Sequence, residues 1–115
     1  MKRISFALTI PQFEDGTKDV TRRLGWRKLT PGTRLLAVDK VMGWPRGHRG
    51  GGRVLGEIEV VAVRREPLHL IDDDDVRREG FPDRNAAWFV QMSCRQMRCA
   101  PDTVVARIEF RKCDA

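Results

Sequence analysis

The sequence predicts a single α+β domain over residues 1–115, in which about five to six short strands form a small mixed β-barrel with two to three flanking helices. Three observations predict this fold. Several short apolar runs are bounded by proline, glycine and aspartate, which is typical of strands and turns. The longest of these runs holds a glycine in its interior, as a bent barrel strand does. A chain of 115 residues forms one hydrophobic core and is too short for two ordinary ones.

The first part of the chain predicts a strand, a short helix and a second extended segment. Residues 4–8 are apolar and favour a strand, and residues 11–15 have proline at the start of a predicted helix. Gly16 stands where a left-handed C-terminal cap of that helix is expected. From Lys18 onward we expect extended chain, because β-branched residues follow it.

The middle of the chain predicts two further strands, at residues 33–42 and 53–63, separated by a glycine-rich loop at residues 43–52. Gly56 interrupts the second of these strands and predicts a bulge or a barrel bend. A short strand or connector is expected at residues 67–71. The core face of the second strand is predicted to carry Val54, Ile58, Val60 and Ala62.

The last part of the chain predicts two helices and a closing strand. Asp72 is the predicted N-cap of a helix that ends near Glu79, and the aspartates after it favour a helix start electrostatically. Asp83 is the predicted cap of a longer helix, and residues 104–111 predict a strand with one solvent-facing side. The buried stripe of the longer helix is predicted to be Ala86, Phe89, Val90, Cys94 and Met97.

Composition excludes several classes of protein. Three cysteines without CxxC spacing and two isolated histidines predict neither a disulfide framework nor a metal site, and no cofactor is expected. No apolar run is long enough to cross a bilayer, and the N-terminal apolar stretch is too short for a secretory signal. We therefore expect a cytoplasmic protein without a membrane partner. The sequence leaves the oligomeric state open, and we favour a monomer.

Positive charge is concentrated in one stretch of the chain. The net charge is +6, and residues 22–53 carry nine Lys or Arg against a single acid, Asp39. This segregation predicts a positive surface that attracts phosphate, unless the arginines are scattered in space. The basic residues around Trp26 are of the kind that clamp a phosphate while a base stacks on an aromatic ring, and Trp44 has a similar setting.

Residues 16–26 are the strongest candidate for a functional site. They include a lysine, two threonines, two adjacent arginines and a tryptophan, but only two aliphatic residues, so packing alone does not account for them. This segment resembles the central motif of the ASCH family, Gly-x-Lys-x4-Arg, here Gly16, Lys18 and Arg23. Five later features match the family in order: the turn Pro31-Gly32-Thr33, a central strand from residue 56 to 63, Glu79-Gly80-Phe81, a helix with Trp88, and Ile108-Glu109-Phe110.

The resemblance implies a PUA-like barrel, related to domains that bind RNA. Some small members of the family are amidohydrolases that remove the acetyl group of N4-acetylcytidine with a lysine, a threonine three residues later and a distant glutamate. These roles fall on Lys18, Thr21 and Glu79. Other members resemble ribonucleases or bind RNA only. The tandem Arg22-Arg23, the Trp26 segment and the glycine-rich loop depart from the amidohydrolase pattern, so the substrate stays open.

Three functions therefore remain as hypotheses. The first is binding of single-stranded RNA, a nucleotide or a nucleoside in a basic cleft. The second is deacetylation of N4-acetylcytidine, with Lys18 as the base at a lowered pKa, Thr21 as the activated hydroxyl and Glu79 as the group that orients the lysine or returns the proton. The third is RNA cleavage, which could use Lys18, Arg23 and His48. The predicted ligand-binding residues are Arg22, Arg23, Trp26, Arg27, Lys28, Trp44, Arg46 and Arg49.

Two alternatives apply to the catalytic residues. Lys18 could be a solvated charge, Thr21 an ordinary strand residue and Glu79 an acid on a helix surface. In a regular strand, moreover, positions three apart point to opposite faces, so Lys18 and Thr21 converge only if the chain bends between them.

Overall fold

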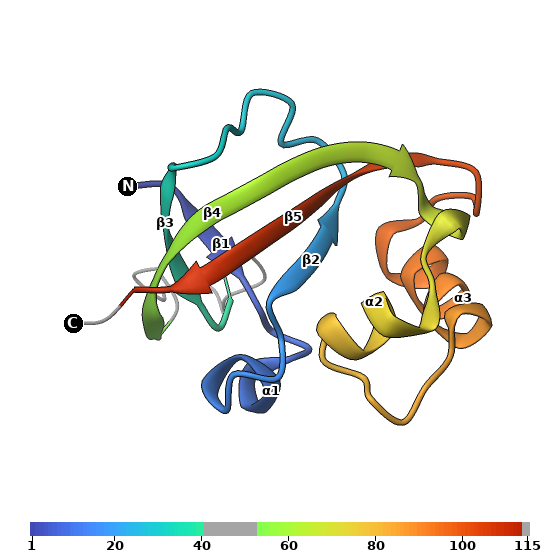
Figure 1. The fold of residues 1–115 in the computed structure, drawn as a ribbon, viewed down its shortest axis with the longest axis horizontal. Coiled ribbons are helices and arrows are strands. Elements are labelled where there is room, and N and C mark those ends of the chain that lie inside the picture. Colours follow the sequence, from blue (N-terminus) through green and yellow to red (C-terminus); the bar gives the residue numbers. More distant parts are fainter. Residues whose placement is uncertain (41–52, 114–115) are drawn as a thin grey trace, which may run out of the picture.

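The structure is a computed structural model that describes residues 1–40 and 53–113. Five strands form one mixed sheet in the order β1-β3-β4-β5-β2, and the helices lie beyond its ends (Figure 1). The predicted α+β class and small barrel-like sheet are confirmed. The elements in chain order are β1 (Arg3–Ser5), α1 (Ile10–Glu14), β2 (Val20–Arg23), β3 (Arg34–Val38), β4 (Val54–Pro67), the 3-10 helix η1 (Leu68–Leu70), α2 (Asp73–Arg78), α3 (Ala86–Met97) and β5 (Val104–Lys112).

The sheet curls so that its two outer strands come close to each other. β4 and β5 form a long antiparallel ribbon across the molecule (Figure 1). β3 continues the sheet to β1 on one side, and β2 pairs antiparallel with β5 on the other. The guanidinium of Arg23, at the end of β2, donates a hydrogen bond to the carbonyl of Ser5 at the end of β1. The Arg23 side chain thus links β1 and β2, the two edge strands, which do not pair with each other in the described part of the sheet.

Irregularities in β4 produce the curl. The register between β3 and β4 shifts next to Gly56, which has a φ of +155° and lies where an added Cβ would be 3.9 Å from the ring of Phe13. This confirms the predicted bulge. A second shift, opposite β5, falls between Val60 and Ala62. The prediction that Ala62 faces the core is therefore wrong: Ala62 is exposed, and Val63 packs against the core instead. Val54, at the start of β4, is also exposed, contrary to the prediction, whereas Ile58 and Val60 are buried as predicted.

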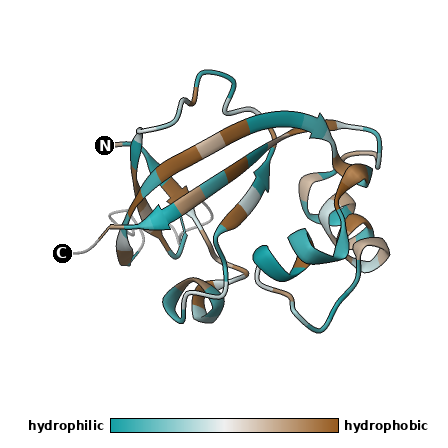
Figure 2. Cartoon of the chain, in the orientation of Figure 1, coloured by the Kyte–Doolittle hydropathy of each residue, from teal (hydrophilic) through white to brown (hydrophobic). Residues whose placement is uncertain are grey.

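Two hydrophobic clusters lie on opposite faces of β5. The larger cluster fills the curl of the sheet and is built around Phe6, Phe13 and Phe110, with ring centroids of Phe6 and Phe13 5.0 Å apart. The smaller cluster packs Val105 of β5 against the helices. Apolar and polar residues alternate along much of β5, whereas β4 has an apolar stretch followed by a polar one (Figure 2). The expectation that one side of β5 faces solvent is only partly correct: Arg111 is exposed, but the helical segment covers Val105 and Arg107, which is only 5% exposed.

The helices follow the expected order with some corrected ends. Gly16 takes the predicted left-handed conformation after α1, with φ +85°, and the connector predicted at residues 67–71 contains η1. Asp72 caps α2, since its side chain accepts a hydrogen bond from the Asp75 amide at 2.8 Å. Asn85, not Asp83, caps α3, because a turn brings the extended chain to Asn85 and its side chain accepts from the Trp88 amide.

The predicted stripe of α3 is partly correct. Phe89 is buried, and four further residues of the stripe are partly buried against the smaller cluster: Ala86, Val90, Cys94 and Met97. The prediction did not include Ser93, a polar residue of α3 that is also buried. Within the described residues, no helix has the length and apolar character that a membrane span requires.

Candidate functional site

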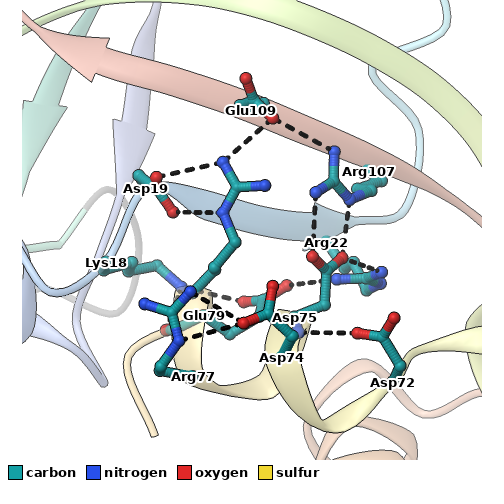
Figure 3. A network of polar contacts seen from close by, with 11 residues as sticks. Lys18, Asp19, Arg22, Asp72, Asp74, Asp75, Arg77, Glu79, Arg107 and Glu109 are labelled. Atoms are coloured by element: carbon teal, nitrogen blue, oxygen red, sulfur yellow. Dashed lines mark hydrogen bonds and ion pairs between the residues drawn. The ribbon is translucent and has the colours of Figure 1, made fainter. Parts of the chain in front are cut away.

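Lys18 is fixed where the chain passes between α1 and α2. Its amide donates to the carbonyl of Gln12 at 3.0 Å, and the next amide, of Asp19, donates to the carbonyl of Arg78 at 2.9 Å. The Lys18 ammonium donates to both the carbonyl oxygen and the carboxylate Oε1 of Glu79, at 2.7 and 2.9 Å (Figure 3). Lys18 is 4% exposed and Glu79 is 3% exposed. Neither side chain is the solvated surface charge of the alternative interpretation.

A network of buried ion pairs extends from Glu79 into the protein (Figure 3). Arg22 donates to Glu79 Oε2 at 3.3 Å, to Asp75 Oδ2 at 2.6 Å and to Glu66 Oε1 at 3.0 Å. Arg107 then holds both oxygens of Asp75, at 2.7 and 2.9 Å. The Glu79 side chain is therefore held by Arg22, whose own orientation is fixed by the carboxylates of Asp75 and Glu66. Asp75, which the sequence explains only as a helix-start acid, lies at the centre of this network.

A cavity of about 240 Å³ opens beside Lys18 and Glu79. Thr21 and Arg23 of β2 line it together with Lys18, and the segment after β1 contributes Phe6. The polar groups thus share one cavity with an aromatic ring, which lies 5.8 Å from the Lys18 ammonium. The opposite wall comes from α3 and the segment before it, through Phe81, Met92, Ser93, Gln96 and Met97.

Lys18 and Thr21 line the same cavity although they are three residues apart. β2 begins only at Val20, so Lys18 precedes the strand and the alternation of side chains along a strand does not apply to it. Thr21 is 3% exposed, and its Oγ1 accepts a hydrogen bond from Arg23 Nε at 2.9 Å. The hydroxyl proton of Thr21 is therefore not committed to this bond.

Burial controls the charge of the site. It lowers the pKa of the Lys18 ammonium below its ordinary value of 10.5, while Glu79 opposes the shift and Arg23 and Arg22 add to it. Hydrogen bonds from Arg107 and Arg22 hold the pKa of the Asp75 carboxyl well below its usual range. The neutral amine of Lys18 is therefore populated at a lower pH than the neutral amine of a solvent-exposed lysine.

The predicted ligand-binding residues divide into three groups. Arg22 and Arg23 lie at the cavity, although Arg22 is engaged by carboxylates. Trp26, Arg27 and Lys28 line a separate hollow of about 520 Å³ on the other side of the β2 terminus. The segment from Lys18 to Trp26, predicted to line one pocket, therefore contributes to two separate hollows. Trp44, Arg46, His48 and Arg49 lie outside the described residues.

Sequence reasoning missed the wall that α3 contributes. Ser93 is 4% exposed, and Gln96 lies one helical turn after it. Both line the cavity, so α3 contributes polar atoms to a wall whose other residues, Phe81, Met92 and Met97, are apolar. A serine within the apolar stripe was the available signal. Among the described residues, no group of three or more His, Cys, Asp or Glu side chains is placed to hold a metal ion.

The close approach at Gly80 yields a testable prediction. A Cβ on Gly80 would lie 2.9 Å from Gln12 Cβ and 3.5 Å from Lys18 Cβ. Gly80→Ala is therefore expected to cost about 1–3 kcal/mol of unfolding free energy beyond the backbone strain of its positive φ. Gly32→Ala is the control, since Gly32 also has a positive φ, +90°, but no atom within 4 Å of its Cβ position. Equal urea midpoints for the two variants would contradict the prediction.

No protein-family model and no curated protein matches the chain. Solved structures do match. A protein from Enterococcus faecalis V583, described by the family model DUF984, superposes with a TM-score of 0.67 at 14% identity, covering 91% of this chain and 69% of that one. An ASCH domain from Lactobacillus crispatus JV V101 gives a TM-score of 0.61 at 18% identity, covering 91% and 70%. The chain therefore has an ASCH-like fold, as the resemblance of its motif predicts.

Proposed function

We propose that this ASCH-like domain binds one nucleobase, as a nucleoside or an unpaired nucleotide, in the cavity beside Lys18 and hydrolyses an acyl group from its exocyclic amine. The observation that carries the proposal is the buried pair of Lys18 and Glu79 at the wall of a cavity that Thr21 also lines. N4-acetylcytidine is the substrate that the family resemblance indicates.

The size and lining of the cavity favour a small, flat ligand. Its volume of about 240 Å³ lies below the ~300 Å³ at which pockets for drug-sized molecules begin. Phe6 and Phe81 supply apolar surface, and Ser93 and Gln96 supply hydrogen-bonding groups. The charges of Lys18 and Arg22 are balanced by carboxylates, so these residues favour a neutral ligand over a phosphate.

The reaction assigned to these residues proceeds in two stages. Neutral Lys18 accepts the hydroxyl proton of Thr21 as Thr21 Oγ1 attacks the acyl carbonyl carbon. The carbon–nitrogen bond then breaks, the proton passes to the departing amine, and the acyl group remains on Thr21. Water next attacks the ester carbonyl carbon and gives a proton to Lys18. The bond from that carbon to Thr21 Oγ1 then breaks, Lys18 returns the proton to Thr21 Oγ1, and the carboxylic acid is released. The sum is amide plus water giving amine plus acid.

Neighbouring groups support this chemistry. Arg23 Nε donates to Thr21 Oγ1 at 2.9 Å, which stabilises developing negative charge on that oxygen. Glu79 orients the Lys18 ammonium through two acceptors and can take part in the proton transfer to the leaving amine. Arg22, which touches Glu79 but not the ligand in this proposal, is a positioning residue.

The direct test is to incubate the protein with N4-acetylcytidine and quantify cytidine and acetate by chromatography. Equal amounts of the two products are expected. Thr21→Val should abolish hydrolysis while cytidine still binds in calorimetry, since valine keeps the shape but lacks the hydroxyl. Thr30→Val, at an exposed threonine, is the matched control and should retain activity. Absence of cytidine release, or full activity of Thr21→Val, would contradict the proposed reaction.

RNA cleavage has weaker support among the residues that the structure describes. A phosphodiester transition state needs uncompensated positive charge, whereas Lys18 and Arg22 are both paired with carboxylates. Arg23 alone at this cavity lacks such a pair in the described part of the chain.

A further inference from the structure

The second hollow lies at the turn that follows β2. Its volume is about 520 Å³, and three cations line it, Lys2, Arg27 and Lys28, together with Trp26. The remaining lining residues are uncharged: Gly25, Leu29, Thr33 and Leu35. A concave surface lined by one sign of charge concentrates ions of the opposite sign.

The charges of this hollow are uncompensated, unlike those of the first cavity. Across residues 1–40 and 53–113, Lys2, Arg27 and Lys28 form no ion pair, whereas Lys18 and Arg22 are each held by carboxylates. The Lys2 ammonium instead lies 4.4 Å from the centroid of the Trp26 ring. These cations are therefore available to an anion from solution.

The backbone of the hollow is held in an uncommon conformation. Trp26 has a φ of +53°, directly after Gly25 at +77°, and a bulky residue in this region carries strain that the surroundings must offset. Arg65 donates to the Gly25 carbonyl at 3.0 Å, and Trp26 packs against the larger hydrophobic cluster. These two contacts hold the backbone of the turn, from which Arg27 and Lys28 directly follow.

The two hollows follow each other along the gap between β1 and β2. Arg23 reaches Ser5 at the first cavity, and Lys2 reaches Trp26 at the second hollow. On each segment the two contacts are only three positions apart in the sequence, so the two hollows are neighbours. Arg23, which forms no ion pair within the described ranges, lines the first cavity at the end of β2. The chain continues from there into the turn that lines the second hollow, so uncompensated cations lie at both.

We propose that the second hollow binds phosphate groups of a single-stranded polynucleotide whose base occupies the cavity beside Lys18. The physiological ligand is then a nucleotide within a strand and not a free nucleoside. This inference rests on the proposed base-binding function for the position of the base, while the phosphate site itself stands on Lys2, Arg27 and Lys28.

The test measures how salt changes the affinity for a labelled single-stranded oligocytidylate by fluorescence anisotropy. Each phosphate contact contributes about 0.7 to the slope of log K against log salt. Three contacts give a slope of about −2, which is a loss of about 20-fold between 50 and 200 mM salt. Arg27→Gln with Lys28→Gln should reduce the slope to about −0.7. Arg95→Gln, at an exposed α3 arginine, is the control and should leave the slope unchanged.

Separate measurements distinguish this inference from the proposed function. Binding of free cytidine should be the same in the double variant and the wild type, because the variant leaves the first cavity intact. If cytidine binds but the oligonucleotide binds no more tightly, the phosphate site is refuted and base binding stands. If the double variant weakens strand binding and Arg95→Gln does not, the phosphate site stands. If the wild type then fails to hydrolyse N4-acetylcytidine, the proposed reaction is refuted separately. A salt-independent affinity, or equal loss in Arg95→Gln, overturns the phosphate site.

Discussion

Asp75→Ala is expected to lower the free energy of unfolding by about 3–5 kcal/mol, the largest stability effect of any single change proposed for this protein. The carboxylate of Asp75 is the shared partner of Arg22 and Arg107, whose side chains are 1% and 6% exposed. Removing it leaves two buried guanidinium groups without their principal acceptor. Urea denaturation followed by circular dichroism measures the loss.

Asp74→Ala is the matched control, one residue earlier in the same helix. Asp74 is exposed, and its one ion pair within the described ranges is with Arg77, so its loss should cost less than about 1 kcal/mol. Similar midpoints for the two variants would show that the buried network contributes no more than a surface pair.

The same network determines the response of stability to acid. Arg107 and Arg22 lower the pKa of Asp75 in the folded protein relative to the unfolded chain. A depressed carboxyl pKa stabilises the fold at pH values above the unfolded pKa, about 3.9, and the stabilisation disappears as the pH falls toward the folded pKa. The difference between wild type and Asp75→Asn should therefore shrink below about pH 4.

Lys18→Met is expected to reduce the hydrolysis of N4-acetylcytidine by about 10²–10⁴-fold, the range that a general base contributes. Methionine has a similar length but cannot accept a proton. The fold should persist, because Arg22 still pairs with Glu79 after the change. Arg77→Met, at an exposed arginine of α2, removes a cation outside the cavity and should leave the rate unchanged.

The pH profile of the wild type provides a second readout of Lys18. Because the neutral amine is the reactive form, the rate should rise with pH and level off above the Lys18 pKa. Burial lowers that pKa from 10.5, so the plateau should begin below this value. Substantial activity of Lys18→Met, or a rate that falls as the pH rises through this range, would remove Lys18 from the role of base.

Local signals in the sequence were sufficient to predict the course of most of the chain. Gly56 predicted the bend of β4, because a glycine acts through its own backbone conformation. Asp72 predicted the start of α2, because its side chain accepts a hydrogen bond from a backbone amide three residues later. The Gly16-Lys18-Arg23 motif predicted the segment that lines the cavity. Such features depend on residues close together in the chain, so they can be recognised before the fold is known.

Long-range features were not predictable in the same way. Asp75 reads as an ordinary helix-start acid, because its partners Arg22 and Arg107 are 53 and 32 residues away. The separation of Trp26 from Lys18 into different hollows depends on the approach of β1 to β2. The exposure of Ala62 follows from an extra residue in a ladder with β5. Each depends on which strands become neighbours.

The order of the strands has a consequence for biosynthesis. β2, which leads directly from Lys18, forms its only described ladder with β5, the last strand of the sheet. Its partner residues therefore emerge from the ribosome long after Lys18 itself. Until β5 has been synthesised, the segment that holds the cavity lacks the strand with which β2 pairs, so the Lys18 site cannot be completed before the last strand of the sheet is present.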